Sequence, residues 1–226
     1  IALFSDDGTA YTMRVNEIPV SSGYGEPVAK YFRLSDQAKI VGMLTTDERF
    51  LPQVKTVKGD EPQPPFIVVV TSQGQVIRTP YLPFKVASTK AGRMYARLND
   101  GDKVVLVALA DKHKSMMLAS RNGHVIHFDL DEVNILSGVG KGVMGIKLED
   151  DDICLGGLLI GSKDDVLQVE TSNEKTLDFK GTKYDLVARG GKGFEAVKRS
   201  NFVRVIPPQI NLINWDEVVQ EELKKS

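Results

Sequence analysis

The sequence predicts an all-β fold, a propeller-like array of about four blades with four short strands each. The main observation is a hairpin that recurs along the chain. Its turn falls at Gly8, Gly74, Gly123 and Glu174, so that successive turns are 66, 49 and 51 residues apart. A period near 50 residues with about four strands per unit is the signature of a blade array. A β-sandwich would need no such fixed period.

A second observation is the glycine-containing loop that follows each hairpin. The distance from turn to loop glycine is 17 residues for Gly8 to Gly25, and then 18, 19 and 19 residues in the units that follow. The loops read S-S-G-Y-G-E-P-V at 21–28, S-T-K-A-G-R-M-Y at 88–95, S-G-V-G-K-G-V at 137–143 and V-A-R-G-G-K-G-F at 187–194. Because each loop stands between a hairpin and a strand, we expect the four loops to occupy equivalent positions.

The strands follow from short apolar stretches between turn residues. In the first unit, residues 1–46, apolar and polar residues alternate on both sides of Asp6-Asp7-Gly8, which predicts a tight hairpin. The strands expected there are Ile1–Ser5, Ala10–Val15, a stretch around Val28–Leu34, and Lys39–Leu44. The second unit, 66–110, is expected to contain Phe66–Thr71, Gln75–Thr79 and Lys103–Leu109. The third, 114–160, is expected to contain Ser115–Ala119, His124–Phe128 and Ile153–Ile160. The fourth, 162–208, is expected to contain Asp165–Glu170, Lys175–Phe179 and Phe202–Ile206.

Two segments fall outside the repeat. Residues 47–65 are rich in proline and charge and have no sustained period, which indicates an insertion or linker. In the tail, residues 209–226, Trp215, Val218, Val219 and Leu223 alternate with acids and lysines and predict a short amphipathic helix on the last blade. The chain begins at Ile1 within strand-like sequence, so we expect it to be part of a longer protein.

Composition narrows the function classes. The longest apolar run, Val104–Ala110, is far shorter than the roughly 20 residues that span a bilayer, so no membrane partner is expected. The net charge is −1, but residues 66–113 carry seven basic and three acidic residues. A near-neutral chain can still present a basic stripe on one face. The lone Cys154 excludes internal disulfides, fits a reducing cytoplasm and is expected to be a core residue.

The sequence contains no recognisable catalytic, metal or cofactor site. His124 and His127 are three residues apart on a strand and point to opposite faces. Asp150-Asp151-Asp152 is interpreted as a solvated turn, because carboxylates on consecutive residues diverge. Gly138–Gly142 lacks the Ser or Thr that follows the lysine of a phosphate-binding loop.

The glycine-rich loops remain as candidates for binding. Exposed backbone N–H groups allow close approach to phosphate, and flanking Arg or Lys neutralises it, which suits sequence-independent contact with the DNA backbone. The alternative is that the glycines only serve turns with positive φ. For the Gly25 loop, which carries Glu26 and no base, we favour this alternative. The predicted DNA contacts are Arg189, Gly190, Gly191, Lys192, Gly193, Lys141, Lys90, Arg93, Arg78, Lys85, Lys198 and Arg199.

Several motifs resemble one known family. They are A-L-F-S-D-D-G-T-A-Y-T-M-R-V-N-E-I-P at 2–19, V-V-T-S-Q-G-Q-V-I-R at 69–78, G-V-M-G-I-K-L at 142–148 and R-G-G-K-G at 189–193. Together they resemble the C-terminal domain of the A subunit of bacterial type IIA topoisomerases, DNA gyrase and topoisomerase IV. The last motif resembles most of the family's Q-R-R-G-G-K-G box, with Val187 and Ala188 in place of Gln and Arg. This box lies in the last recognisable blade, whereas in typical gyrases it lies in the first.

The resemblance implies a β-pinwheel, a blade array whose blades exchange strands and whose basic outer rim binds and bends duplex DNA. It further implies that the chain has no catalytic activity of its own. The rest of the A subunit and the ATPase partner subunit would be its partners, in the bacterial cytoplasm and in association with the nucleoid. The alternative from another class is a propeller that binds other proteins. A third, a metal-dependent hydrolase propeller, is disfavoured because His and Asp do not cluster at strand ends. The resemblance leaves gyrase and topoisomerase IV both open.

Overall fold

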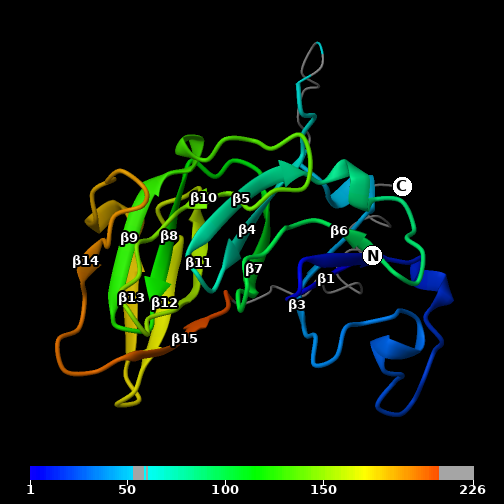
Figure 1. Ribbon diagram of the computed structural model, residues 1–226, viewed down its shortest axis with the longest axis horizontal. Helices are drawn as coiled ribbons and strands as arrows, with labels where there is room; N and C mark the ends of the chain where they lie inside the picture. The colour runs from blue at the N-terminus through cyan, green and yellow to red at the C-terminus, as the bar shows by residue number, and fades with distance from the viewer. Residues whose placement is uncertain (53–58, 60, 209–226) are drawn as a thin grey trace, which may run out of the picture.

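The structure, a computed structural model, describes residues 1–52, 59 and 61–208. Within these residues, the regular structure consists of β-strands and short 3-10 turns, as Figure 1 shows. The strands form three sheets of four strands and one sheet of three, and all neighbours are antiparallel. The predicted all-β blade array is therefore confirmed, with three described strands rather than four in the last blade.

Each sheet forms one blade, and the blades are numbered in chain order. Blade 1 has the spatial order β3 (Ile40–Leu44), β1 (Ala2–Ser5), β2 (Thr9–Thr12) and β6 (Arg93–Met94). Blade 2 has the order β7 (Val104–Ala110), β4 (Phe66–Thr71), β5 (Gln75–Pro80) and β10 (Val143–Met144). Blade 3 has the order β11 (Cys154–Ile160), β8 (Ser115–Ser120), β9 (His124–Asp129) and β14 (Phe194–Glu195). Blade 4 has the order β15 (Phe202–Ile206), β12 (Val166–Thr171) and β13 (Thr176–Lys180). The 3-10 turns are η1 (Val15–Glu17), η2 (Val28–Lys30), η3 (Glu48–Phe50), η4 (Leu82–Phe84), η5 (Leu130–Glu132) and η6 (Gly181–Lys183).

The fourth strand of each complete blade is supplied by the next sequence unit. β6 belongs to the second unit but pairs with β2 of blade 1. In the same way β10 pairs with β5 of blade 2, and β14 pairs with β9 of blade 3. We call β6, β10 and β14 the exchange strands, and the loops that end at Gly92, Gly142 and Gly193 the exchange loops. Consecutive blades are thus joined by strand exchange, as the family resemblance implies.

Glycine at the hairpin turn makes room for the exchange segment. Gly74 has a φ of +79°, in the left-handed region, and a Cβ at this position would lie 2.6 Å from the carbonyl oxygen of Ile146. At Gly8 the corresponding distance, to the carbonyl oxygen of Ala96, is 2.4 Å. The turn therefore needs glycine both for its backbone conformation and because any side chain would collide with the next unit.

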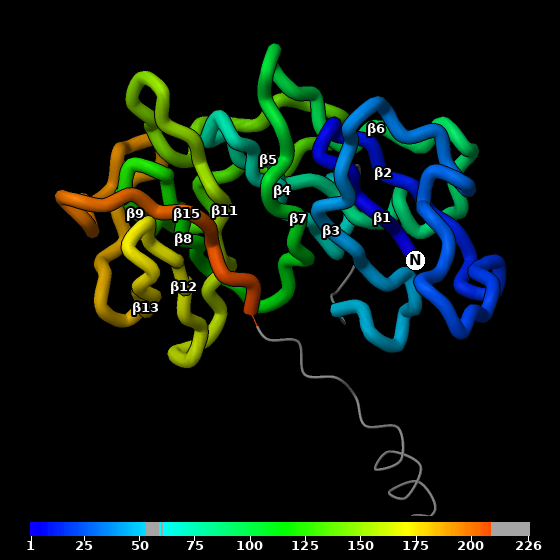
Figure 2. The backbone as a smooth tube through the Cα atoms, turned by 90° about the horizontal axis from the view of Figure 1, so that it is seen from below, coloured from blue at the N-terminus to red at the C-terminus, as the bar shows by residue number. Residues whose placement is uncertain are grey.

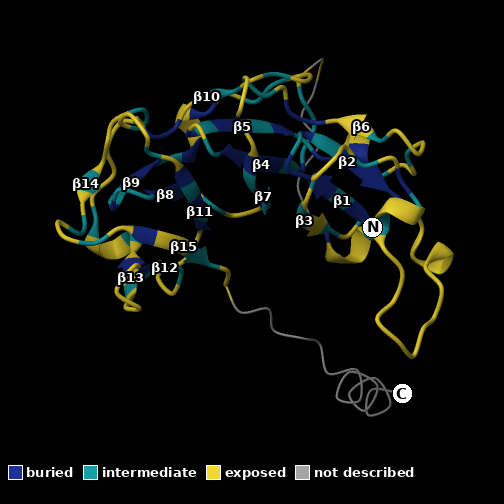
Figure 3. Cartoon of the chain, turned by 60° about the horizontal axis from the view of Figure 1, so that its bottom comes forward, coloured by how far each residue is buried: buried dark blue, intermediate teal, exposed yellow. Residues whose placement is uncertain are grey.

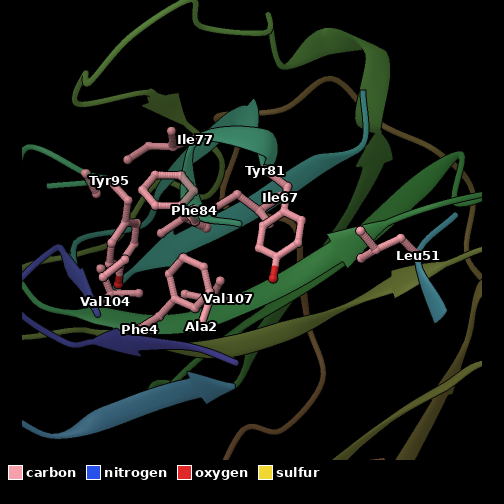
Figure 4. Close-up of a cluster of buried hydrophobic side chains, with 13 residues drawn as sticks. Ala2, Phe4, Leu51, Ile67, Ile77, Tyr81, Phe84, Tyr95, Val104 and Val107 are labelled. Atoms are coloured by element: carbon pink, nitrogen blue, oxygen red, sulfur yellow. The ribbon is translucent and has the colours of Figure 1, made fainter. Parts of the chain in front are cut away.

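The blades pack face to face through strands that are buried on both sides. In β4, Ile67 and Val69 face the core between blades 1 and 2, while Val68 and Val70 face the core between blades 2 and 3. In β8, side chains likewise alternate between the core shared by blades 2 and 3 and the core shared by blades 3 and 4. Figure 4 shows the core between blades 1 and 2, in which the Phe4 and Tyr95 rings lie edge to face with their centroids 5.1 Å apart. In Figure 3 the buried positions follow the central strands, and the exposed positions follow the connecting loops.

One predicted strand is wrong. Residues 28–30, within the expected strand Val28–Leu34, form η2, and the N–H groups of Tyr31 and Phe32 both donate to the carbonyl oxygen of Val28. Pro27 stands just before this turn with an extended backbone, and its carbonyl oxygen accepts the N–H of Lys30, so the backbone groups of this segment are bonded locally rather than to a neighbouring strand. Two other predictions fall partly or wholly outside the described residues. The insertion is described except at 53–58 and 60, and the helix predicted for the tail falls on 209–226, outside the described residues.

Cys154 occupies the core position that its apolar surroundings predict. Its side chain is 1% exposed, and burial raises the pKa of the thiol to about 12. Because the thiolate is the reactive form, we expect the folded chain to resist iodoacetamide at pH 8 and to be alkylated only after unfolding in urea. Intact-mass spectrometry measures both reactions. Rapid alkylation in native buffer would contradict the buried position of Cys154.

Candidate functional site

The exchange loops lie along one edge of the array. The strands β3, β7, β11 and β15 form the inner edges of their blades and pack against one another from blade to blade. Figure 2 shows their labels in a row. A Cβ on Gly42 of β3 would lie 3.0 Å from the Cβ of Val107 in β7. The exchange strands form the opposite, outer edge of each four-stranded sheet, so their loops share an outer rim.

At three places along this rim, a basic residue of one unit lies beside the exchange loop of the next. The backbone N–H of Arg97, for example, donates to the carbonyl oxygen of Gly140 at 3.0 Å, next to Lys141. The same backbone contact joins Arg33 to Lys90 at 2.8 Å and Lys147 to Gly191, beside Lys192, at 2.9 Å. We call these places basic junctions. They bring together Arg33 with Lys90, Arg97 with Lys141, and Lys147 with Lys192.

The first two junctions carry charge that the fold leaves unneutralised. Arg33, Lys90, Arg97 and Lys141 are all exposed, and across 1–52, 59 and 61–208 none of them forms an ion pair. Exposed cations that stand on adjoining backbone segments and lack a counter-charge attract anions such as phosphate. These junctions are therefore the strongest candidates for an anion-binding surface.

The third junction differs, because Lys192 forms an ion pair with Glu149. The hydrogen bond from Lys192 lowers the pKa of the Glu149 carboxyl, so the pair is charged at neutral pH. Glu149 stands two residues after Lys147, and the residue two after Arg97 is the neutral Asn99. The acid is thus specific to this junction and partly neutralises it.

Arg189, the first residue of the box-like motif, is held within the protein. Its Nε donates to the carbonyl oxygen of Glu132 at 2.9 Å, and its Nη1 donates to that of Met144 at 3.0 Å. Its backbone N–H donates to the Glu132 carboxylate at 3.2 Å. Arg189 therefore ties the last exchange loop to the unit before it, a structural role that the sequence prediction of DNA contact did not include.

The glycines of this motif also have structural reasons to be glycine. Gly190 and Gly193 have φ values of +79° and +75°, and a Cβ on Gly193 would lie 2.1 Å from the carbonyl oxygen of Val125. The N–H of Gly190 donates to the carbonyl oxygen of Gly145 at 2.7 Å. Gly191 supplies the acceptor of the third junction. The contact of these glycines with DNA stays a prediction.

The remaining predicted contacts fall into two groups. Arg93 on β6, and Lys198 and Arg199 after β14, are exposed on the rim and have no ion pair among the described residues. Arg78 is mostly covered: its Nη1 lies 3.0 Å from Oδ1 of Asp131, and its Cζ lies 5.5 Å from the centroid of the Phe66 ring. Lys85 forms an ion pair with Glu48 at 2.7 Å. The charges of Arg78 and Lys85 therefore already have partners in the chain.

Sequence reasoning missed Arg33, Arg97 and Lys147. A signal for two of them exists, because Arg97, Lys147 and Lys198 each follow a loop glycine (Gly92, Gly142 and Gly193) by five residues. The three basic positions lie just beyond the loops, in strand-like sequence, and not among the loop glycines that mark the repeat.

The groups considered for catalysis have structural partners. His127 is buried, with its Nε2 2.8 Å from the Ser115 hydroxyl and its Nδ1 2.8 Å from the carbonyl oxygen of Tyr184. Asp152 accepts hydrogen bonds from the N–H groups of Asn122 and Ile153, as expected of a turn carboxylate. In the part of the chain that the structure describes, no group of three or more His, Cys, Asp or Glu is placed to hold a metal ion. No helix there is long and apolar enough to cross a membrane.

Strand exchange between blades and repeated basic junctions on the outer rim define a class of protein, the β-pinwheel type of propeller domain. Comparison with protein families agrees with this class. The family model described as DNA gyrase C-terminal domain, beta-propeller, matches residues 1–47, 65–111 and 114–160. The chain belongs to this family. The three matched segments coincide closely with the first three predicted units.

Relatives of the chain include A subunits of DNA gyrase. The subunit of Helicobacter pylori (strain ATCC 700392 / 26695) is 29% identical over 206 residues, which cover 88% of this chain and 23% of the relative. That of Escherichia coli (strain K12) is 24% identical over 221 residues, which cover 97% of this chain and 24% of the relative. The chain thus spans about a quarter of the length of these relatives.

Two solved structures share the fold. The crystal structure of the C-terminal domain of DNA topoisomerase IV superposes with a TM-score of 0.77 at 23% identity, covering 92% of this chain and 63% of that chain. The Escherichia coli ParC C-terminal domain superposes with a TM-score of 0.66 at 17% identity, covering 92% and 81% of the two chains. At this identity the likeness concerns the fold.

Proposed function

We propose that the chain is the DNA-binding and DNA-bending module of a type IIA topoisomerase A subunit. The observation that carries this proposal is the row of basic junctions on the outer rim. Each junction is set by a backbone hydrogen bond between units, so its charges recur at intervals fixed by the fold. Charges that recur along a curved edge suit the backbone of a bent duplex, and they need no base contact.

In the whole enzyme, the module would hold a DNA segment while other parts carry out cleavage, strand passage and ATP hydrolysis. It would thereby support ATP-dependent supercoiling or decatenation, in contact with the rest of the A subunit, the ATPase partner subunit and the nucleoid. We expect the chain alone to be non-catalytic and to require no cofactor. The second candidate, a propeller that binds other proteins, has no specific observation in its favour among the residues that the structure describes.

The direct test is a binding titration of the 226-residue chain with duplexes of unrelated sequence, read by fluorescence anisotropy. We expect similar affinities for all duplexes and a steep loss of affinity as salt increases, because bound counterions are released from each neutralised phosphate. An affinity that does not change between low and physiological salt would contradict phosphate neutralisation. A strong preference for one duplex sequence would contradict backbone recognition.

The ion pair at the third junction leads to a separate prediction. Glu149→Gln is expected to increase DNA affinity and to steepen the log-log salt dependence by up to about 0.9, because Lys192 becomes free to contact one phosphate. The control Glu132→Gln removes an equal charge beside Arg189, whose main bonds to backbone carbonyls remain. Equal gains from both variants would indicate a general charge effect rather than release of Lys192.

A further inference from the structure

The three strand exchanges obey one rule. The exchange segment of a unit pairs with the second hairpin strand of the preceding blade, and its backbone N–H groups donate to the carbonyl oxygen of the turn glycine. Gly145 donates to Gly74 at 2.8 Å, and Ala196 donates to Gly123 at 2.8 Å. The rule requires an acceptor edge with a glycine at its turn, since the incoming backbone passes directly over that residue.

Blade 4 has an acceptor edge, β13, that no described strand occupies. Its hairpin turn is built like the other three. The N–H of Glu174 donates to the carbonyl oxygen of Thr171 at 2.9 Å, just as that of Gly74 donates to Thr71 at 2.9 Å. Glu174 is therefore the structural counterpart of the three turn glycines.

Glu174 nevertheless carries a side chain. Its φ is +61°, so it keeps the left-handed conformation that glycine adopts most easily. In blades 1 to 3, a Cβ at the same position would lie 2.4, 2.6 and 2.3 Å from atoms of Ala96, Ile146 and Val197 in the incoming segment. The Cβ of Glu174 thus occupies the space through which a fourth exchange segment would pass.

A second position on the edge differs in the same sense. Two residues after the turn stand Ala10, Val76 and Val125 in blades 1 to 3, all of them buried and paired with, or adjacent to, the incoming strand. The counterpart in blade 4 is Thr176, which is polar and exposed. The charged Asp178 and Lys180 further along β13 are also exposed, and charges on an edge strand discourage pairing with another strand.

We infer that blade 4 is an end of the array whose outer edge is adapted to prevent strand exchange. Its β13 edge accepts no exchange segment, whether from a further blade, from a blade that would close the array into a ring, or from a second copy of the chain. The array is therefore open at blade 4 with respect to strand exchange. Lys198 has the position of Arg97 and Lys147, but within residues 1–52, 59 and 61–208 no following exchange loop lies beside it.

The test offers β13 a segment of the kind that the other edges accept. A peptide with the sequence of residues 137–148, which contains β10, is titrated to millimolar concentration into the ¹⁵N-labelled 226-residue chain. Amide shifts of β13 are followed by NMR. The native chain is compared with Glu174→Gly/Thr176→Val, which restores the acceptor pattern, and with Glu174→Ala/Thr176→Val, which keeps the obstructing Cβ.

We expect shifts at β13 only in the Glu174→Gly/Thr176→Val variant. Binding of the peptide to the native β13 edge would overturn the inference. Equal binding to both variants would show that the Cβ is no obstacle, and an absence of binding to either would show that Glu174 and Thr176 are not what closes the edge. None of these outcomes depends on whether the chain binds DNA, so the proposed function is tested separately.

Discussion

Replacing Gly142 by alanine is expected to lower the free energy of unfolding by about 2–5 kcal/mol. Gly142 has a φ of +77°, and a Cβ there would lie 2.2 Å from the carbonyl oxygen of Val76. The left-handed backbone accounts for about 1–2 kcal/mol of the loss. The collision, which forces β10 away from β5, adds on the order of 1–3 kcal/mol. Urea denaturation measures the sum.

The matched control is Gly101→Ala. Gly101 has a similar φ of +68°, but no atom lies within 4 Å of the position that its Cβ would take. It therefore reports the backbone cost alone. If the two substitutions destabilised the chain equally, the collision of a Cβ at position 142 with the hairpin would contribute nothing to the loss of stability.

Replacing Arg33, Lys90, Arg97 and Lys141 together by alanine is expected to give the largest loss of DNA binding. These residues form the first two basic junctions. If each contacts one phosphate, the log-log salt dependence should flatten by up to about 3.6, at roughly 0.9 per phosphate. The melting temperature should change little, because exposed charges contribute little to stability.

A second fourfold variant controls for net charge. Lys39, Lys112, Lys114 and Lys163 are exposed and lie in connections outside the exchange loops. Their replacement by alanine removes the same number of charges. An equal loss of binding in both variants would mean that total charge rather than the rim determines affinity.

The strands and hairpins of this fold could be predicted from the residues themselves, but the pairing of strands between units could be expected only from the family resemblance. Phe66–Thr71 and Phe202–Ile206 were predicted with the bounds that the structure shows, because apolar stretches between turns report strands directly. No pattern of neighbouring residues indicates that the backbone of Val143 pairs with that of Val76, a residue of the preceding unit. The strand predicted at Val28–Leu34 is wrong because its apolar residues resemble those of a strand, whereas the chain forms a 3-10 turn after Pro27.

The candidate site shows the same division. The exchange loops and their positive charges are visible in the sequence because they recur with the repeat. Whether a given charge is free depends on distant residues. Lys192 is paired with Glu149, 43 positions away, and Arg189 with the backbone of Glu132, 57 positions away. Both basic residues of the motif most similar to the family box therefore have partners within the protein.

The measurement that tests the central claim most directly is the bend angle of duplex DNA bound to the chain. Energy transfer between dyes at the two ends of a duplex reports this angle at saturating protein. We predict higher transfer for duplex bound to the native chain than for free duplex. Transfer should be clearly lower with the variant lacking Arg33, Lys90, Arg97 and Lys141, and close to native with the variant lacking Lys39, Lys112, Lys114 and Lys163. Bound duplex with the transfer of free duplex, or equal transfer with all three proteins, would contradict a DNA-bending rim built from the basic junctions.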